Sequence, residues 1–195
     1  FGHAHPRLRK ALEEASGNFW TIGGSLQAPS RRTFMEKLEE RFPGHTSFLC
    51  NSGAEAIEGA LKLVLALRPE RSRFLALRRS FHGRTLGALG LTFNPRYRRP
   101  WQSALLPVEH LEPSELLESL DERVAGVFVE PLQGEGGLDA LTPEFCRNLR
   151  QRCSEVGALL AADEIQTGWG RCGVLSLARE WGADPELLCF AKGVA

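Results

Sequence analysis

The sequence predicts an α/β fold: a mainly parallel sheet in a three-layer arrangement, with helices on both faces. Two observations lead to this prediction. Apolar segments of strand length alternate along the chain with longer segments of helical periodicity. The segments 124–130, 158–164 and 186–192 are apolar almost throughout and lack the polar alternation of a half-exposed strand, so both of their faces are expected to be buried.

The first half of the chain opens with two amphipathic segments. Apolar residues recur in them at helical spacing, and the second stops at a Pro-Gly pair that ends helices. A short apolar run, TSFLC, predicts the first strand, and Ala and Leu along one face of the next segment predict a helix. The expected order is helix 6–15, helix 29–42, strand 46–50, helix 53–67 and strand 73–78.

The second half repeats the same alternation. SELLESL predicts a short helix, and a longer one is bounded by proline at its start and glycine at its end. The apolar runs between them predict buried strands. The expected order is helix 114–120, strand 124–130, helix 143–157, strand 158–164 and strand 186–192.

Composition narrows the function classes. The 24 basic and 24 acidic residues give a formal net charge of zero, which argues against a nucleic-acid binder or a membrane-surface protein. No apolar run is long enough to span a bilayer. The five cysteines are scattered, so we expect reduced thiols and a cytoplasmic protein.

Ligands of parallel α/β sheets bind at the carboxyl ends of the strands, so the residues after each strand are the candidates. The run NSGAEA follows the strand expected at 46–50 and opens a helix. Free backbone N–H groups at a helix start bind anions, and Ser52, Gly53 and Ala54 are small enough to let a phosphate approach. The alternative is that Asn51 and Ser52 merely cap the helix.

Two charged residues follow buried strands. Asp163 needs a partner, which would be a cationic ligand atom. The alternative is that Asp163 caps a loop or pairs with Arg171. Lys192 follows an apolar run, where a lysine loses its proton more readily and becomes an amine nucleophile. The alternative for Lys192 is an end-of-strand lysine that reaches into solvent.

Two loops complete the set of candidates. SFHGRT brings an aromatic ring (Phe81) and a cation (Arg84) close to a glycine, unless it is a simple surface turn. The loop after 124–130 is glycine-rich and is flanked by Glu130 and Glu135, unless it is a solvated turn. A phosphate cradle, an aromatic face, an acid for a ring nitrogen and a lysine for an aldehyde together specify pyridoxal phosphate.

The motifs resemble those of class III pyridoxal-phosphate aminotransferases, the group that acts on acetylornithine, ornithine, 4-aminobutyrate and putrescine. They appear in the family's order across nearly the whole chain. They are GHAHP (2–6), NSGAEAIEGALKL (51–63), SFHGRTLGAL (80–89), EPLQGEGG (130–137), ADEIQTGWGR (162–171) and FAKG (190–193).

The resemblance implies a role for each candidate around pyridoxal 5'-phosphate. Lys192 would carry the cofactor as a Schiff base and shuttle a proton, Asp163 would pair with the ring nitrogen, and Gln166 would bind the ring hydroxyl. Phe81 would stack on the ring. The phosphate would bind to Ser52, Gly53 and Ala54.

On the substrate side, the resemblance implies that Arg84 takes a carboxylate and that Glu135 lies nearby. It gives His82 and Arg171 no chemistry. His3 and His5 are conceivable metal ligands, but no further ligands accompany them, so no metal is expected.

The resemblance implies the large domain of a fold type I pyridoxal-phosphate transferase. Residues 1–195 would be part of that domain, without the family's N-terminal segment and C-terminal small domain, and inactive alone. The full-length form would be a homodimer that moves an amino group from an amino acid or ω-amine to a 2-oxo acid such as 2-oxoglutarate. The alternatives are an aminomutase or racemase of the same fold, or an inactive truncated member acting as a subunit or scaffold.

Overall fold

The structure, a computed structural model, describes residues 2–18, 21–23 and 26–194. The chain divides into two compact units, Phe1–Phe48 and Leu49–Ala195. The first unit contains helices α1 (Pro6–Ser16) and α2 (Pro29–Arg41), each with proline in its first turn. Both expected helices are therefore confirmed.

The second unit is built on a five-stranded sheet in the order β2-β1-β3-β6-β7, in which every neighbouring pair is parallel. Four of these strands coincide with predicted ones. The fifth, β2, was missed because it is only three residues long and includes Glu and His. The strands are β1 (Arg73–Leu77), β2 (Glu109–Leu111), β3 (Val124–Val129), β6 (Leu159–Asp163) and β7 (Leu187–Cys189).

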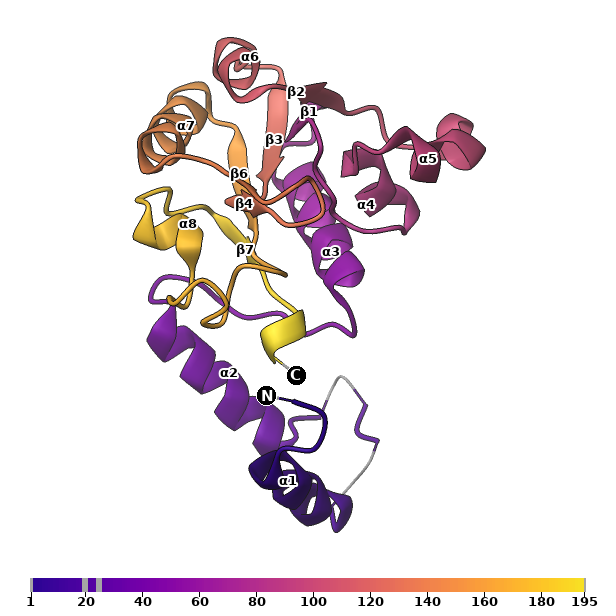
Figure 1. Cartoon of the computed structure of the whole chain (residues 1–195), viewed down its shortest axis with the longest axis vertical. Helices are drawn as coiled ribbons and strands as arrows, with labels where there is room; N and C mark the ends of the chain where they lie inside the picture. Colours follow the sequence, from indigo (N-terminus) through magenta and orange to yellow (C-terminus); the bar gives the residue numbers. More distant parts are fainter. Residues whose placement is uncertain (1, 19–20, 24–25, 195) are drawn as a thin grey trace. The chain divides into compact units, whose positions relative to one another are not determined.

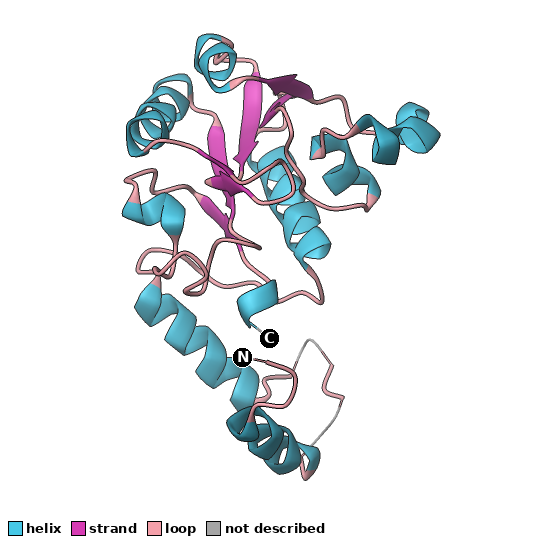
Figure 2. Cartoon of the chain, viewed as in Figure 1, coloured by secondary structure: helices cyan, strands magenta, loops and turns pink. Residues whose placement is uncertain are grey.

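Helices cover both faces of this sheet, as Figures 1 and 2 show. One face packs on α3 (Gly53–Leu67) and α4 (Leu86–Leu91). The other packs on α6 (Pro113–Glu118), α7 (Pro143–Val156) and α8 (Leu177–Glu180). The predicted three-layer α/β fold is confirmed.

Strand β1 shows how the sheet separates its two cores. Phe74 and Ala76 belong to the cluster with α3, whereas Leu75 and Leu77 belong to the cluster with α7. Successive side chains of a strand point to opposite faces, so a strand between two helix layers must be apolar at every position. This is why the continuous apolar runs of the sequence predicted the fold correctly.

The strand expected at 46–50 is wrong, because these residues have no regular structure. Phe48 is 81% exposed and Leu49 is 40% exposed. A strand needs a neighbour for its backbone hydrogen bonds, and no strand in the described part of the chain pairs with this segment. An apolar run alone was not sufficient evidence for a strand here.

Several short elements lack a sequence pattern of their own. Two of them, β4 and β5, form an antiparallel hairpin that encloses the glycine-rich loop. The others are a short helix and 3₁₀ turns. These elements are β4 (Leu132–Gln133), β5 (Asp139–Ala140), α5 (Pro95–Arg98), η1 (Arg99–Ala104) and η2 (Lys192–Val194).

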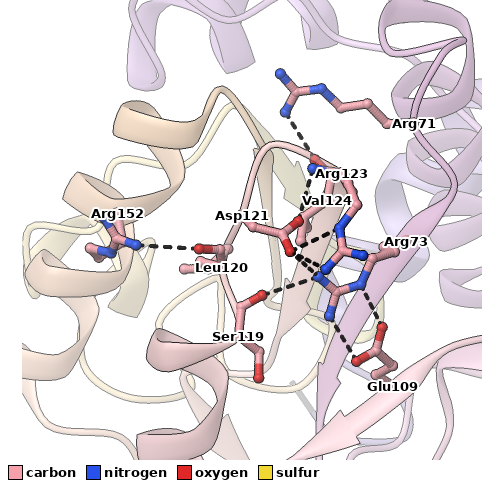
Figure 3. A network of polar contacts seen from close by, with 9 residues as sticks. All are labelled: Arg71, Arg73, Glu109, Ser119, Leu120, Asp121, Arg123, Val124 and Arg152. Atoms are coloured by element: carbon pink, nitrogen blue, oxygen red, sulfur yellow. Dashed lines mark hydrogen bonds and ion pairs between the residues drawn. The ribbon is translucent and has the colours of Figure 1, made fainter.

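Two arginines, Arg71 and Arg73, make hydrogen bonds at the amino ends of the strands. Arg73, at the start of β1, donates to Glu109 at 2.7 and 2.9 Å and to Asp121 at 2.7 Å, which links β1 to β2 and to the turn before β3 (Figure 3). Arg71 donates to the carbonyl oxygens of Val124 and Val156 at 3.0 and 2.8 Å. These contacts hold the end of the sheet opposite to the strand ends that carry the candidate residues.

Candidate active site

The parallel strands carry the candidate residues to one edge of the sheet. Phe81 and Arg84 lie in the loop after β1, Glu135 in the hairpin loop after β3, and Asp163 is the last residue of β6. Lys192 follows β7. Because the strands run in the same direction, these chain segments leave the sheet from the same edge.

Asp163 is buried, with 4% of its surface exposed, and its partner is a histidine. His82 Nδ1 lies 2.8 Å from Asp163 Oδ2. A carboxylate only accepts, so Nδ1 carries the proton of this hydrogen bond. The other carboxylate oxygen accepts from the backbone N–H of Ile165 at 3.1 Å. The alternative in which Asp163 caps the following loop is therefore confirmed, whereas the pairing with Arg171 is wrong, since Arg171 is exposed and makes no ion pair with Asp163 among the described residues.

His82 is fully enclosed and is the main site residue that sequence reasoning left without a role. It is 1% exposed, and its Nε2 has no hydrogen-bond partner within the described chain. Burial favours the neutral imidazole, but the hydrogen bond and charge of Asp163 outweigh it, so the pKa of His82 lies above its ordinary value. The pair therefore presents a carboxylate that is held in place by the N–H of a buried imidazole.

Lys192 does not lie at the end of a strand as expected. Strand β7 ends at Cys189, because β6, the one strand that pairs with it in the described part of the chain, ends opposite it at Asp163. The chain then turns, and Lys192 begins η2 with a positive φ of 33°. Its side chain is exposed in the described chain, so the expected apolar surroundings are absent, and its Nζ donates to Gln166 Oε1 at 3.1 Å.

Gln166 is held by a close backbone contact. A Cβ added to Gly134 would lie 2.5 Å from the Gln166 carboxamide, so a larger residue at this position would displace the Gln166 side chain. The glycine-rich loop thus covers the side chain that binds Lys192. This explains the glycine at that position better than a solvated turn does.

The start of α3 is packed against two strand-end loops. A Cβ on Gly53 would lie 2.9 Å from the Ile165 side chain. A Cβ on Gly83, whose φ is 133°, would lie 2.9 Å from the Cβ of Ala54. The Ser52 hydroxyl accepts from the N–H of Glu55 at 3.2 Å, so the capping interpretation of Ser52 is confirmed. The N–H groups of Gly53 and Ala54 lie in the first turn and have no acceptor within the helix, and the helix dipole favours an anion at this end.

Three further candidates differ in their surroundings. Phe81 is half-buried and meets Tyr97 edge to face, with ring centroids 6.0 Å apart. Arg84 and Glu135 are exposed, and neither makes an ion pair with another described residue. Their side chains are therefore available to a ligand.

Glu164, next to Asp163, has a different task. It is 1% exposed and accepts from Thr167 Oγ1 at 2.8 Å and from Ser176 Oγ at 2.5 Å. It also accepts from the first backbone N–H groups of α8, at 3.0 and 2.9 Å. The carboxylate thereby anchors α8 to the end of β6.

Replacing Glu164 by alanine should lower the free energy of unfolding by on the order of 3 kcal/mol, because four buried donors lose their acceptor. Urea denaturation measures this change. The matched control is Glu122→Ala, which removes an exposed glutamate and should alter the free energy by less than about 0.5 kcal/mol. Equal effects of the two variants would contradict the anchoring role.

No metal site accompanies these residues. Across residues 2–18, 21–23 and 26–194, no group of three or more potential metal ligands lies together. His5, one of the two N-terminal histidines, caps α1 by accepting from the N–H of Arg7 at 3.3 Å. Among the same residues, no helix has both the length and the apolar character needed to cross a bilayer.

Comparison with known proteins identifies a family. The family described as Aminotransferase class-III matches residues 1–195. Acetylornithine aminotransferase 1 of Bradyrhizobium diazoefficiens is 39% identical over 201 residues, which cover 99% of this chain and 50% of that protein. The chain spans about half the length of the curated relatives it matches.

Solved structures agree with this result. The ornithine aminotransferase of Toxoplasma gondii ME49 superposes with a TM-score of 0.92 at 28% identity, covering 100% of this chain and 50% of that one. An amine transaminase from an uncultivated Pseudomonas species, solved in its PLP-bound form, gives a TM-score of 0.88 at 27% identity, covering 99% of this chain and 51% of that one.

Proposed function

Because this chain belongs to the class III aminotransferases, we propose that it binds pyridoxal 5'-phosphate and serves amino-group transfer. The donor is an amino acid or an ω-amine, and the acceptor is a 2-oxo acid such as 2-oxoglutarate. One observation carries the proposal: a lysine and a buried Asp–His pair lie on chain segments that leave one end of a parallel sheet, and the N-terminus of α3 packs against two of these segments, at Ile165 and Gly83. This combination fits the chemistry of a phosphorylated pyridine aldehyde.

The residues present fit the phosphate of this cofactor. The N–H groups of Gly53 and Ala54 begin a helix of 15 residues, whose dipole favours an anion. The Ser52 hydroxyl is already the acceptor of the helix cap but retains its own proton to donate. These three residues would hold the phosphate.

The residues also fit the pyridine ring. Asp163 would bind the protonated ring nitrogen, Gln166 the ring hydroxyl, and Phe81 would lie against the ring. When bound, the cofactor supplies an electron sink for the bond that breaks at the amino-bearing carbon. Asp163 preserves that sink by keeping a positive charge on the ring, and His82 holds the carboxylate in place.

Lys192 would bind the cofactor covalently through its amine and would move the proton at the reacting carbon. Its hydrogen bond to Gln166 keeps the amine beside the group that would bind the ring. Arg84 would bind a substrate carboxylate with the two N–H groups of its guanidinium fork. Glu135 would lie on the substrate side.

The assembly is part of the same proposal. We assign residues 1–195 to the cofactor-binding large domain of a cytoplasmic homodimer, with a further N-terminal segment and a small C-terminal domain. The half-length match to the relatives supports this assignment. Exposed apolar side chains (Leu63, Leu67 and Trp101) support burial against a second copy.

The reaction is tested on the complete protein with a panel of amino donors: ornithine, acetylornithine, 4-aminobutyrate, putrescine and lysine, with and without 2-oxoglutarate. We expect glutamate to form in amounts equal to the donor consumed, and only when the acceptor is present. Product without acceptor would instead indicate an aminomutase or racemase. No consumption of any donor by protein that holds the cofactor would indicate an inactive subunit.

A further inference from the structure

Glu130 occupies the centre of the candidate site, although none of the roles above uses it. It directly follows β3, the middle strand of the sheet, and is only 4% exposed. The neighbouring strands, β1 and β6, lead to Phe81 and end at Asp163, respectively. A carboxyl group in such a position is costly to bury without partners.

The first partner of Glu130 is the backbone of the loop after β1. Glu130 Oε1 accepts from the N–H of Phe81 at 2.8 Å. This hydrogen bond ties the end of β3 to the residue that would lie against the cofactor ring. The backbone N–H of the next residue, His82, donates to the buried hydroxyl of Thr92 at 2.9 Å. The loop is therefore fixed on both sides of Phe81.

Three ionisable groups act electrostatically on Glu130, one from the carboxyl end of each of strands β1, β6 and β7. His82, after β1, and Lys192, after β7, favour the ionised carboxylate, whereas Asp163, at the end of β6, disfavours it. Burial is the largest influence and, together with Asp163, raises the pKa of Glu130 to about 7. Glu130 therefore changes charge near neutral pH.

We propose that Glu130 is a positioning residue that fixes the Phe81 loop and balances the charge of the site by gaining and losing one proton. The carboxyl group accepts from Phe81 in both states. Its ionised form places a negative charge near His82 and Lys192, and its neutral form removes that charge. The hydrogen bond and the buried position carry this inference, and only its consequence for the cofactor rests on the proposed function.

The proton on Glu130 is tested first without the cofactor. The complete apoprotein is titrated while the infrared absorption of protonated carboxyl groups is recorded. We expect a band that disappears around pH 7 in the wild type. It should be absent in Glu130→Gln, which keeps the acceptor for Phe81 but cannot titrate. It should persist in Glu122→Gln, which changes an exposed glutamate beyond the other end of β3.

In the holoprotein, the Glu130 variants distinguish the effect of the Glu130 proton from the effect of its hydrogen bond to Phe81. With Glu130→Gln, the pH dependence of the cofactor's visible absorption near neutral pH should be lost, with little change in affinity for pyridoxal phosphate. Glu130→Ala, which also loses the acceptor for Phe81, should weaken that affinity about tenfold.

A wild-type apoprotein without the band, or a band that survives in Glu130→Gln, would overturn the proposal. So would a holoprotein pH dependence that is identical in Glu130→Gln and in the wild type. A protein that shows the Glu130 band but binds no pyridoxal phosphate in any variant would instead refute the proposed function.

Discussion

Replacing Lys192 by alanine should abolish turnover, with kcat falling at least roughly a thousandfold, because one side chain would supply both the covalent attachment and the proton transfer. The same change should leave the fold intact. Lys192 is exposed in the described chain, and its one hydrogen bond is to the Gln166 side chain. Initial rates with the best donor of the panel measure the loss, and the free energy of unfolding measures the fold.

Two further variants make this result specific. Lys62→Ala removes an exposed lysine on α3 and should retain wild-type kcat. Lys192→Arg keeps the positive charge and much of the length, but its guanidinium is not a nucleophile at neutral pH, so it should be as inactive as Lys192→Ala. Appreciable activity of Lys192→Arg would mean that Lys192 acts only through its charge.

Asp163→Asn should lower kcat by on the order of 10²–10⁴-fold while most of the cofactor stays bound. Asparagine can still accept from Ile165, and its amide can donate to His82 once the imidazole shifts its proton to Nε2. The fold should therefore survive. What disappears is the negative charge that would keep the ring nitrogen protonated, and with it the raised pKa of His82.

Single-turnover rates of bound cofactor with an amine separate this effect from binding. The control is Asp184→Asn, which neutralises an exposed aspartate and should change neither rate nor cofactor content. NMR titration of His82 provides an independent readout, since its pKa should fall in Asp163→Asn and stay raised in Asp184→Asn. An unchanged single-turnover rate in Asp163→Asn would contradict the role of Asp163.

Local patterns were sufficient to predict much of the fold and the positions of the candidate residues. Continuous apolar runs marked β1, β3, β6 and β7, and the rule for parallel sheets then pointed to the residues that follow them. The pattern does not separate Asp163, the last residue of β6, from Glu164, which directly follows it. One of these acids meets His82, and the other anchors α8.

The contacts that complete the site connect residues far apart in the sequence, so no local sequence pattern predicts them. His82 and Asp163 are 81 positions apart, and Phe81 and Glu130 are 49 apart. Nothing in SFHGRT says which strand end its histidine will meet, because that depends on strand order in the sheet. The same reason explains the error at 46–50, where strand formation depends on a neighbour and not on apolar residues alone.

Covalent trapping of the cofactor tests the central claim most directly. Pyridoxal phosphate is bound to the protein and reduced with borohydride, and the labelled peptide is identified by mass spectrometry. Residues 1–195 contain four lysines, at positions 10, 37, 62 and 192, and the labelled peptide distinguishes each of them from the others. The proposed function predicts a single pyridoxyl group on Lys192. A group on Lys10, Lys37 or Lys62, or no attached group at all, would contradict it.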